Sequence, residues 1–379
     1  MSGVQLLVNG DGPAVEYAVR MHQFDQYQRL NLQLDANQLS GDDMDELASN
    51  IAQQRQSANV TGPAGRDEKL AHIRDDMWGN LNALDGQPAA KNLQNLRQWT
   101  ARQLDRLEPV LQRRFDDGFV RECHGDLHLS NLLRLPGGIT AFDCIEFGAE
   151  FRNIGVMSDL AYLVMDLVSR QRIDLAYRFL NRYLELTGDY ASMEIFTLYF
   201  IYRCLVRAKV AAIRSQERKR DNHAKRDLSK VRKYCDMASR QTQQQTPTLI
   251  IMHGLSGSGK TWLSGKLVSE LPAVRVRADI ERKRMLGIDE LADSESGVGK
   301  GIYSKDTSRD TYDRLHCIAE IALRAGHDII VDAWYLKIAE RDEASKLVTR
   351  CCSHYILVQT CAPGPSPAET NTQTRQSRR

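Results

Sequence analysis

A segment at residues 254–261 combines residue types and spacing that suit phosphate binding. It fits the pattern G-x-x-x-x-G-K-[ST] and lies between an apolar run at 249–252 and an amphipathic run at 261–271. Glycines let the backbone curl so that successive N–H groups point at phosphate oxygens, and the following helix adds its positive end. The expected phosphate-binding residues are Gly254, Ser256, Gly257, Ser258, Gly259, Lys260 and Thr261. A glycine-rich turn without a ligand is the alternative.

Two residues of this loop have individual roles in nucleotide chemistry. Lys260 supplies a full positive charge for the β- and γ-phosphates of ATP, and the Thr261 hydroxyl is placed to ligate Mg²⁺. A second apolar run, at 328–332, ends in Asp332, where nucleotide-binding domains of this kind place a carboxylate that holds the Mg²⁺ shell. We therefore expect Asp332 to be the partner of Thr261. A surface aspartate at the end of a strand is the alternative, because this motif is short.

The sequence between these two motifs suggests a site for a phosphate acceptor. At residues 276–284 a short strand gives way to a helix rich in cations. This part of the chain resembles the gluconate and shikimate kinase-like group, through residues 254–261, 277–286, Tyr303 and 331–336. The resemblance implies that Asp279 and Arg282 face the acceptor. A solvated helix face stabilised by pairs of opposite charges is the alternative.

A second constellation at residues 124–131 has the spacing of the kinase catalytic loop H-R-D-L-x-x-x-N, with glycine in place of arginine. In that chemistry Asp126 orients the attacking hydroxyl and accepts its proton, and Asn131 ligates a metal. After a turn at 136–138, Asp143 would hold Mg²⁺ on the phosphates. A hairpin from 131 to 143 would bring both metal ligands to one end of a small sheet. We expect His128 and Cys144 to be packing residues.

The form H-G-D-L-H-x-x-N, followed by F-D-C-I-E-F, resembles the aminoglycoside phosphotransferase family, a branch of the protein-kinase-like fold. The resemblance runs from about residue 16 to 234, and Glu146 and Arg152 match it as well. It implies that His124 is structural. The tandem with a P-loop kinase domain looks like the bacterial proteins named bifunctional aminoglycoside phosphotransferase/ATP-binding protein, or AAA family ATPase.

These motifs predict an α/β protein, in which a mostly helical, protein-kinase-like C-lobe precedes a P-loop α/β domain with a parallel sheet. Strands are expected at 4–8, 15–21, 119–123, 131–135, 139–142 and 249–252, with a buried one at 355–359. Helices are expected through most of 23–117, including 91–115, and from 158 to 240. The expected divisions are a kinase-like domain at 1–240, a linker at 241–248, a P-loop domain at 249–361 and a disordered tail at 362–379.

The chain departs from both families at its ends. Kinase-like folds hold ATP with a glycine-rich loop and a lysine-bearing strand, which should precede residue 16, and Arg20 replaces a lysine imperfectly. P-loop kinases continue beyond residue 359 into an arginine-bearing lid. Here Arg375, Arg378 and Arg379 are expected to be solvated. Both lobes are thus expected to be incomplete, with impaired turnover.

Composition excludes several classes of function. The 379 residues are 42% hydrophobic and 26% charged with a net charge of +2, which gives no electrostatic case for nucleic acid. No apolar run suits a membrane span and no signal peptide is evident, so a cytoplasmic location is expected. The eight cysteines show no zinc or disulfide spacing and are expected to be reduced and mostly buried. The charged stretch at 203–233 is expected to be a solvated helix face.

The sequence thus favours an enzyme, an ATP-dependent phosphotransferase that uses Mg²⁺ and a small-molecule acceptor. A nucleotide-binding regulatory protein with little or no phosphoryl transfer is the main alternative. A degenerate fragment that folds incompletely is a third. The sequence identifies neither the acceptor nor the oligomeric state, because fold and catalytic loop do not specify a substrate pocket.

Overall fold

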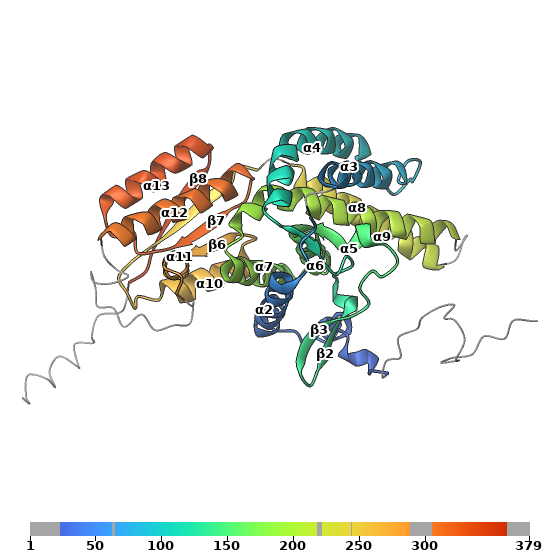
Figure 1. Ribbon diagram of the computed structural model, residues 1–379, viewed down its shortest axis with the longest axis horizontal. Coiled ribbons are helices and arrows are strands. Elements are labelled where there is room, and N and C mark those ends of the chain that lie inside the picture. The colour runs from blue at the N-terminus through green and yellow to red at the C-terminus, as the bar shows by residue number, and fades with distance from the viewer. Residues whose placement is uncertain (1–22, 63–64, 218–221, 244, 289–304, 362–379) are drawn as a thin grey trace, which may run out of the picture.

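The computed structural model describes residues 23–62, 65–217, 222–243, 245–288 and 305–361. The expected hairpin at 4–21, Tyr303 and the tail at 362–379 lie outside these ranges. Figure 1 shows a helical part, which ends with the pair α8 and α9, and a part built on a sheet, which carries α10 to α13. We refer to them as the helical part and the sheet part.

Long helices dominate the helical part, as the sequence predicts. They are α1 (Leu30–Asp35), α2 (Gly41–Ser57), α3 (Arg66–Asn82), α4 (Leu93–Asp116), α6 (Val156–Ser169), α7 (Ile173–Thr187), α8 (Met193–Glu217) and α9 (Asn222–Gln241), with the single turn α5 (Ala149–Arg152). Helix α2 begins at a capping box between Ser40 and Asp43, which satisfies backbone donors of its first turn. Helix α6 is buried along almost its whole length. Even so, none of the described helices is both long enough and apolar enough to cross a bilayer.

Two small antiparallel ladders hold the loops of the helical part. Strand β1 (Val120–Glu122) pairs with β4 (Asn153–Gly155), and β2 (Leu132–Leu135) pairs with β3 (Gly138–Ala141). Short 3₁₀ turns at Gln26–Gln28, Leu129–Asn131 and Tyr190–Ser192 complete this part. The tight turn between β2 and β3 falls at the predicted Pro-Gly-Gly segment, where Gly138 has a φ of 116°. The hairpin predicted from 131 to 143 is therefore present.

A four-stranded parallel sheet forms the sheet part. Its order is β6 (Val274–Arg277), β7 (Ile329–Asp332), β5 (Thr248–His253) and β8 (His354–Gln359). Helix α10 (Lys260–Glu270) connects β5 to β6, α11 (Ala278–Met285) and α12 (Lys305–Arg324) come between β6 and β7, and α13 (Ile338–Cys351) connects β7 to β8. The central strands β5 and β7 are apolar runs because both of their faces are covered. The predicted fold class, a kinase-like helical domain followed by a P-loop α/β domain, is confirmed.

Two expectations about burial are wrong. The strand expected to be buried at 355–359 is β8, which lies at the edge of the sheet and leaves Ile356 47% and Leu357 39% exposed. Among the described strands it pairs with β5 alone. An apolar run in the sequence therefore does not distinguish an edge strand from a central strand. The cysteines are not mostly buried either, because only Cys123, Cys204 and Cys235 are.

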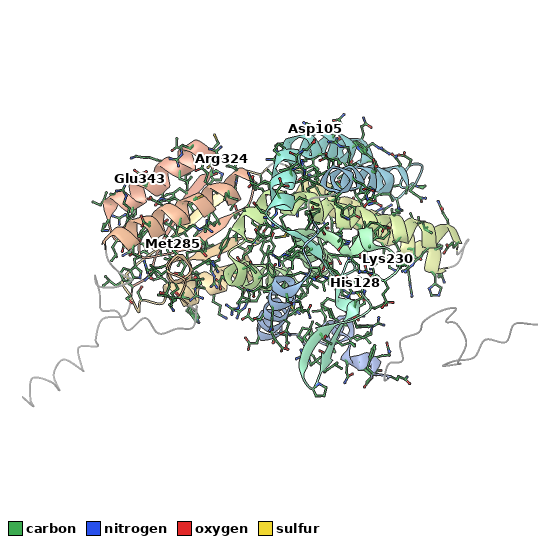
Figure 2. All side chains as sticks on the ribbon, in the orientation of Figure 1. Asp105, His128, Lys230, Met285, Arg324 and Glu343 are labelled. Atoms are coloured by element: carbon green, nitrogen blue, oxygen red, sulfur yellow. The ribbon has the colours of Figure 1, made fainter. Side chains whose placement is uncertain are left out.

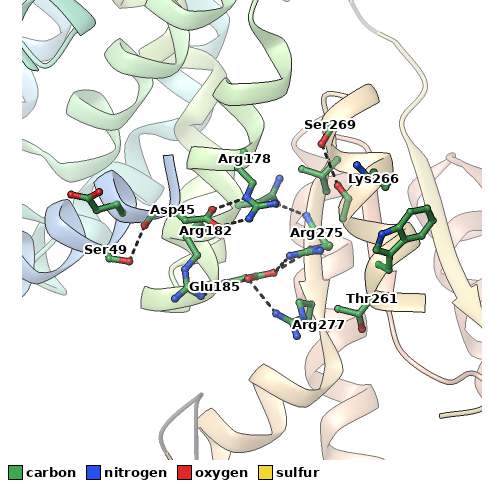
Figure 3. Close-up of a pocket in the computed structure, with 15 residues that line it drawn as sticks. Asp45, Ser49, Arg178, Arg182, Glu185, Thr261, Lys266, Ser269, Arg275 and Arg277 are labelled. Atoms are coloured by element: carbon green, nitrogen blue, oxygen red, sulfur yellow. Dashed lines mark hydrogen bonds and ion pairs between the residues drawn. The ribbon is translucent and has the colours of Figure 1, made fainter. Parts of the chain in front are cut away.

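Helix α7 joins the two parts of the molecule. One continuous hydrophobic core includes α7 residues such as Phe179 and sheet residues such as Val276. The Asn181 amide donates to the Ala273 carbonyl (2.9 Å) and accepts from the Arg275 N–H (2.5 Å), so it satisfies the backbone of the edge strand β6. Figure 3 shows this side of α7 facing β6. Covering an edge strand in this way removes a site for unwanted strand pairing.

His327 makes the contact between the two parts sensitive to pH. Its Nε2 lies 3.2 Å from the Met193 carbonyl oxygen, and its ring packs edge-on against Phe196. Burial lowers the pKa of the imidazole to about 4, although the hydrogen bond to Met193 favours the protonated ring. The unfolded chain, with a histidine pKa of about 6.5, takes up a proton first as the pH falls. The contribution of His327 is thus complete above pH 6.5 and is lost between about pH 6.5 and 4.

We expect His327→Gln to reduce the acid sensitivity of folding. Urea unfolding gives the free energy of unfolding at pH 7.5 and at pH 5.0. The decrease between these two pH values should be about 2 kcal/mol smaller in the variant than in the wild type. The matched control is His354→Gln, because His354 is exposed at the start of β8. Equal losses in the wild type and His327→Gln would contradict the proposed role of His327.

Candidate active sites

The phosphate-binding motif forms a tight loop between β5 and α10. Gly254, Gly257 and Gly259 have φ values of 152°, 77° and 88°, which side chains other than glycine rarely adopt. A Cβ on Gly254 would also lie 2.6 Å from the Thr360 carbonyl oxygen. The strand, the loop and the helix that begins at Lys260 therefore have the arrangement that the sequence predicts for a P-loop.

Lys260 folds back over the loop. Its Nζ donates to the carbonyl oxygens of Gly254 (2.9 Å) and Leu255 (2.6 Å), and its side chain is buried. Burial lowers the pKa of the Lys260 ammonium, and the nearby Asp332 carboxylate opposes this effect. The charge of Lys260 is thus held against the backbone of the loop.

Asp332 ends β7 and is held there by Ser264. Its side chain is buried, and its Oδ2 accepts a hydrogen bond from the Ser264 hydroxyl (2.9 Å). Thr261 is exposed in the first turn of α10. Burial and the bond to Ser264 do not fit the alternative of a surface aspartate. Ser264 itself was not predicted, although its spacing of one helical turn from Lys260 is a usable signal.

A cavity of about 750 Å³ collects most of the predicted residues of the sheet part. Those that line it are Ser256, Gly257, Gly259, Lys260, Thr261, Asp279, Arg282 and Asp332. Gly254 and Ser258 do not line it, and the Ser258 hydroxyl contacts the Thr360 hydroxyl (2.7 Å). Tyr312, Trp334 and Glu340 also line the cavity and were not predicted.

Asp279 and Arg282 lie on α11 at the cavity wall. Arg282 and the neighbouring Glu281 and Lys283 are buried, and Lys283 Nζ lies 3.3 Å from Asp279 Oδ2. The pair is an i,i+4 pair, as the alternative requires, but only Asp279 is partly exposed in it (46%), because the Lys283 side chain is 11% exposed. The face is therefore not fully solvated, and Asp279 and Arg282 line the cavity.

The oxygen donors of this cavity suit Mg²⁺ bound together with phosphates. Among the described residues, no group of three or more His, Cys, Asp or Glu side chains could hold a metal by itself. Mg²⁺ is usually held by one or two carboxylates together with substrate phosphates and water, so a dedicated cluster is not required. The Thr261 hydroxyl and the carboxylates of Asp279, Asp332 and Glu340 are among the oxygen-bearing groups that line the cavity.

The second predicted site lies in the helical part, at the loop between β1 and β2. Figure 2 shows His128 in the helical part and Met285, at the end of α11, in the sheet part. Asp126 is half-buried, and its Oδ2 accepts from the Asn131 amide (2.9 Å). His128 Nε2 lies 3.3 Å from the same oxygen. The predicted base and one predicted metal ligand are therefore in direct contact.

His128 holds Asp126 through a fixed orientation of its ring. Nδ1 accepts from the Ser130 N–H (3.2 Å), which leaves Nε2 to donate to the carboxylate. Burial alone would raise the pKa of the Asp126 carboxyl, but hydrogen bonds from His128, Tyr162 and Asn131 outweigh burial and lower it. Asp126 is thus held ionised. His128 was predicted to be a packing residue, and this contact with Asp126 adds a polar role.

Asp143 follows the hairpin that begins at Asn131. Leu132 pairs with Ala141, and the Phe142 N–H donates to the Asn131 carbonyl (3.0 Å), so the ladder carries Asp143 to the level of Asn131. Asp143 is exposed and has a φ of 60°. Asn131 is buried. The hairpin thus brings the backbone of the two predicted metal ligands to one end of the small sheet.

Buried charges from distant helices hold the catalytic loop. The Asp159 carboxylate on α6 accepts from the N–H groups of His124 and Gly125 (both 3.1 Å) and pairs with Arg55 of α2 at 2.5 Å. Arg203 of α8 donates to the Gly125 carbonyl (3.0 Å) and to Ser158. Arg203 is buried, so the expectation of a solvated helix face at 203–233 is wrong at this position. Arg203 can be buried because the Gly125 carbonyl oxygen of the loop accepts a hydrogen bond from its guanidinium, a contact that the sequence did not reveal.

Arg152 and Glu146 differ in their surroundings. Arg152 Nη1 donates to the carbonyl oxygens of Ile145 and Glu146 (both 3.1 Å), so it clamps the segment after Asp143. The Glu146 side chain is exposed.

His124 Nε2 lies 2.8 Å from the Phe142 carbonyl oxygen, which agrees with the structural role that the family resemblance implies.

Gly125 occupies the position of the arginine in the kinase pattern, and the backbone there requires glycine. Its φ is 83°, and a Cβ would lie 2.6 Å from the Phe151 carbonyl oxygen. We expect Gly125→Ala to lower the free energy of unfolding by about 2–3 kcal/mol, because left-handed strain adds to a backbone clash. Urea denaturation measures this loss. Gly137→Ala, which meets no atom within 4 Å, is the matched control, and equal stability of the two variants would refute the argument.

A cavity of about 410 Å³ opens beside Asp126. Tyr162, Tyr199 and Tyr202 line it together with the carboxylates Asp75, Asp76 and Glu150. It is separate from the cavity at the P-loop and has no lining residue in common with it. Of the residues predicted for the second site, Asp126 lines this cavity, whereas Asn131 and Asp143 do not.

One family model matches residues in each of the two parts of the chain. The family model described as the phosphotransferase enzyme family matches residues 15–196, and the model described as an AAA domain matches residues 249–379. The chain carries a phosphotransferase-family domain followed by an AAA domain. The resemblance drawn from the two motifs is thereby confirmed. We use these two names for the helical part and the sheet part from here on.

Relatives share this tandem region only in part. Uncharacterized proteins of Mycobacterium tuberculosis and Mycobacterium bovis are 28% identical over 225 residues, which is 59% of this chain and 44% of theirs. The chain thus spans less than half the length of these relatives. Among solved structures, an ethanolamine kinase of Plasmodium vivax is 12% identical, with a TM-score of 0.36 over 53% of this chain and 61% of its own. A choline kinase of Cryptosporidium parvum is 14% identical, with a TM-score of 0.34 over 58% and 71%.

Proposed function

We propose that the protein is an ATP-dependent phosphotransferase that transfers a phosphoryl group to a small molecule. The AAA domain would bind ATP and Mg²⁺ through its P-loop, and the phosphotransferase-family domain would carry a second catalytic loop. The observation that carries this proposal is the cavity that Lys260, Thr261 and Asp332 share with Asp279 and Arg282. It supports the proposal because all five side chains line the same cavity.

In the AAA domain, the residues would act by position and charge. Backbone N–H groups of the loop and Lys260 would bind the phosphates, and Thr261 and Asp332 would hold Mg²⁺. Bound ATP would supply the γ-phosphoryl group, and Mg²⁺ would neutralise charge on its oxygens. Asp279 would orient the acceptor's hydroxyl, and Arg282 would offset negative charge at the cavity wall.

In the phosphotransferase-family domain, Asp126 would act on the acceptor. Its carboxylate would accept the proton of a hydroxyl as that oxygen forms its bond to phosphorus and the bond from phosphorus to the leaving nucleotide oxygen breaks. The contacts from His128 and Asn131 support this role because they fix the carboxylate at the edge of the 410 Å³ cavity. Asn131 and Asp143 would supply the metal ligands of this site.

Release of ADP by paired variants tests the proposal. Lys260→Ala should abolish turnover in the AAA domain, and Asp126→Ala should abolish turnover in the phosphotransferase-family domain. Steady ATP consumption that disappears in Lys260→Ala but survives in Asp126→Ala would assign the activity to the AAA domain, and the reverse would assign it to the other. Tight ATP binding with no turnover in the wild type, across a screen of hydroxyl-bearing acceptors, would overturn the enzymatic proposal in favour of a regulatory protein.

A further inference from the structure

The cavity of about 410 Å³ beside Asp126 has an apolar interior. The buried side chains that line it include Met77 of α3, Val120 of β1 and Leu198 of α8. Cavities that bind small molecules have this size, a mostly apolar lining and a few polar groups that fix the orientation of the ligand. The cavity therefore suits a small molecule whose body is apolar.

The charges that line the cavity nearly balance. Four carboxylates do so, and Lys69, Lys209 and Arg203 oppose them. All of the four except Asp126 are exposed, so water solvates and screens them. Asp76, one of these three, also accepts from a tyrosine hydroxyl of the cavity at 3.4 Å. The cavity thus holds no strong surplus of charge that would select an ionic acceptor.

The aromatic rings of the cavity already contact a cation of the protein itself. The Arg203 guanidinium carbon lies 4.8 Å from the centre of the Tyr162 ring and 5.2 Å from that of Tyr202. Arg203 is buried, lines the cavity, and donates to Gly125 and Ser158. A second cation at these rings would be repelled by the buried guanidinium. The lining therefore disfavours a positively charged acceptor.

Asn80 contributes a polar group that has no partner in the free protein. It lies on α3 one turn after Met77, is 5% exposed, and lines the cavity. Neither Nδ2 nor Oδ1 of its side chain has a hydrogen-bond partner among the described residues. A buried polar group without a partner costs free energy, and most such groups in folded proteins are satisfied. A bound molecule with a complementary polar group would satisfy the Asn80 amide.

We propose that this cavity binds an uncharged aromatic alcohol that also carries an amide, and that Asn80 pairs with that amide. The inference rests on the proposed function, because it names the class of acceptor whose hydroxyl Asp126 would deprotonate. An amide offers one acceptor and N–H donors, as the Asn80 side chain does, so the two groups can satisfy each other. The aromatic body would pack against apolar side chains such as Met77 and Leu198.

Three related alcohols test the class of ligand. N-acetylphenylalaninol carries the aromatic ring, the hydroxyl and an uncharged amide. In 3-phenylpropanol the amide is missing, and in phenylalaninol a charged ammonium replaces it. Saturation-transfer NMR titrations of the full chain at pH 7, without nucleotide, give a dissociation constant for each. We expect N-acetylphenylalaninol to bind about fivefold more tightly than either of the others, the effect of one neutral hydrogen bond.

Asn80→Leu tests the role of the amide. The substitution keeps the size of the side chain and removes its hydrogen-bonding groups, so it should weaken N-acetylphenylalaninol about fivefold and leave 3-phenylpropanol unchanged. Asn95→Leu, at an exposed position on α4, is the matched control and should bind like the wild type. The melting temperature of Asn80→Leu should not fall, because the amide makes no hydrogen bond in the free protein and leucine favours a helix. A structural role of Asn80 would lower it.

Each outcome decides for or against the inference. It is overturned if N-acetylphenylalaninol does not bind at millimolar concentrations, if phenylalaninol binds more tightly, or if Asn80→Leu weakens both uncharged alcohols equally. Release of ADP is then measured with ATP, Mg²⁺ and N-acetylphenylalaninol. If the alcohol binds as expected but no ADP is released, the binding site stands and the proposed phosphoryl transfer in this domain fails. Release that disappears in Asp126→Ala supports both.

Discussion

Replacement of Lys260 by alanine is expected to weaken the binding of ATP with Mg²⁺ by roughly 100-fold. Charge-assisted hydrogen bonds contribute about 1.5–3 kcal/mol each, and every 1.4 kcal/mol changes a dissociation constant tenfold. Lys260 is already aimed into the loop by the carbonyl oxygens of Gly254 and Leu255, so the wild type loses little side-chain entropy on binding. Isothermal titration with AMP-PNP measures the difference directly.

The control for this prediction is Lys346→Ala. Lys346 is exposed on α13 and pairs with Glu343, so its loss changes net charge by the same amount far from the loop. Circular dichroism and thermal melts show whether Lys260→Ala keeps its fold. An affinity within threefold of the wild type in folded Lys260→Ala would remove the main support for a nucleotide site in the AAA domain.

The P-loop could be predicted from sequence because its determinants are local. Glycines that need positive φ, and a lysine at the start of a helix, lie within eight residues of one another, so spacing alone specifies the geometry. Asp332 could be predicted in the same way, since a short apolar strand that ends in a carboxylate is a local pattern too. The same holds for the hairpin after Asn131, where the Pro-Gly-Gly turn sets the register.

The contacts that hold these motifs in place were not predictable. Arg55 and Asp159 are 104 residues apart, and Arg203 lies 78 residues from the Gly125 carbonyl that it binds. No local pattern marks such partners, because a buried arginine and a solvated one have the same sequence neighbours. A stretch rich in Arg and Lys was therefore interpreted as a solvated face, although Arg203 within it is buried and donates to carbonyl oxygens of other elements. Glu185, which links α7 to β6, was missed for the same reason.

Asp159→Ala is expected to lower the free energy of unfolding by about 3–5 kcal/mol, the largest loss among the substitutions considered. The carboxylate is fully buried and is the ion-pair partner of Arg55. Burial alone would lower the pKa of Arg55, but Asp159 raises it above its ordinary value, so the two charges depend on each other. Removal of one partner leaves an uncompensated charge in the interior and also strips the acceptor from two backbone N–H groups of the catalytic loop.

Urea unfolding of three variants separates this argument from a general effect of losing an aspartate. Asp105→Ala removes an exposed partner of Arg74 and should cost less than about 1 kcal/mol. The double variant Arg55→Met with Asp159→Ala should recover part of the loss, because no buried charge remains unpaired. If Asp159→Ala were no less stable than Asp105→Ala, the buried pair could not be what holds the loop. Recovery would be incomplete in any case, since the N–H groups of His124 and Gly125 still lack the acceptor that keeps Asp126 in position.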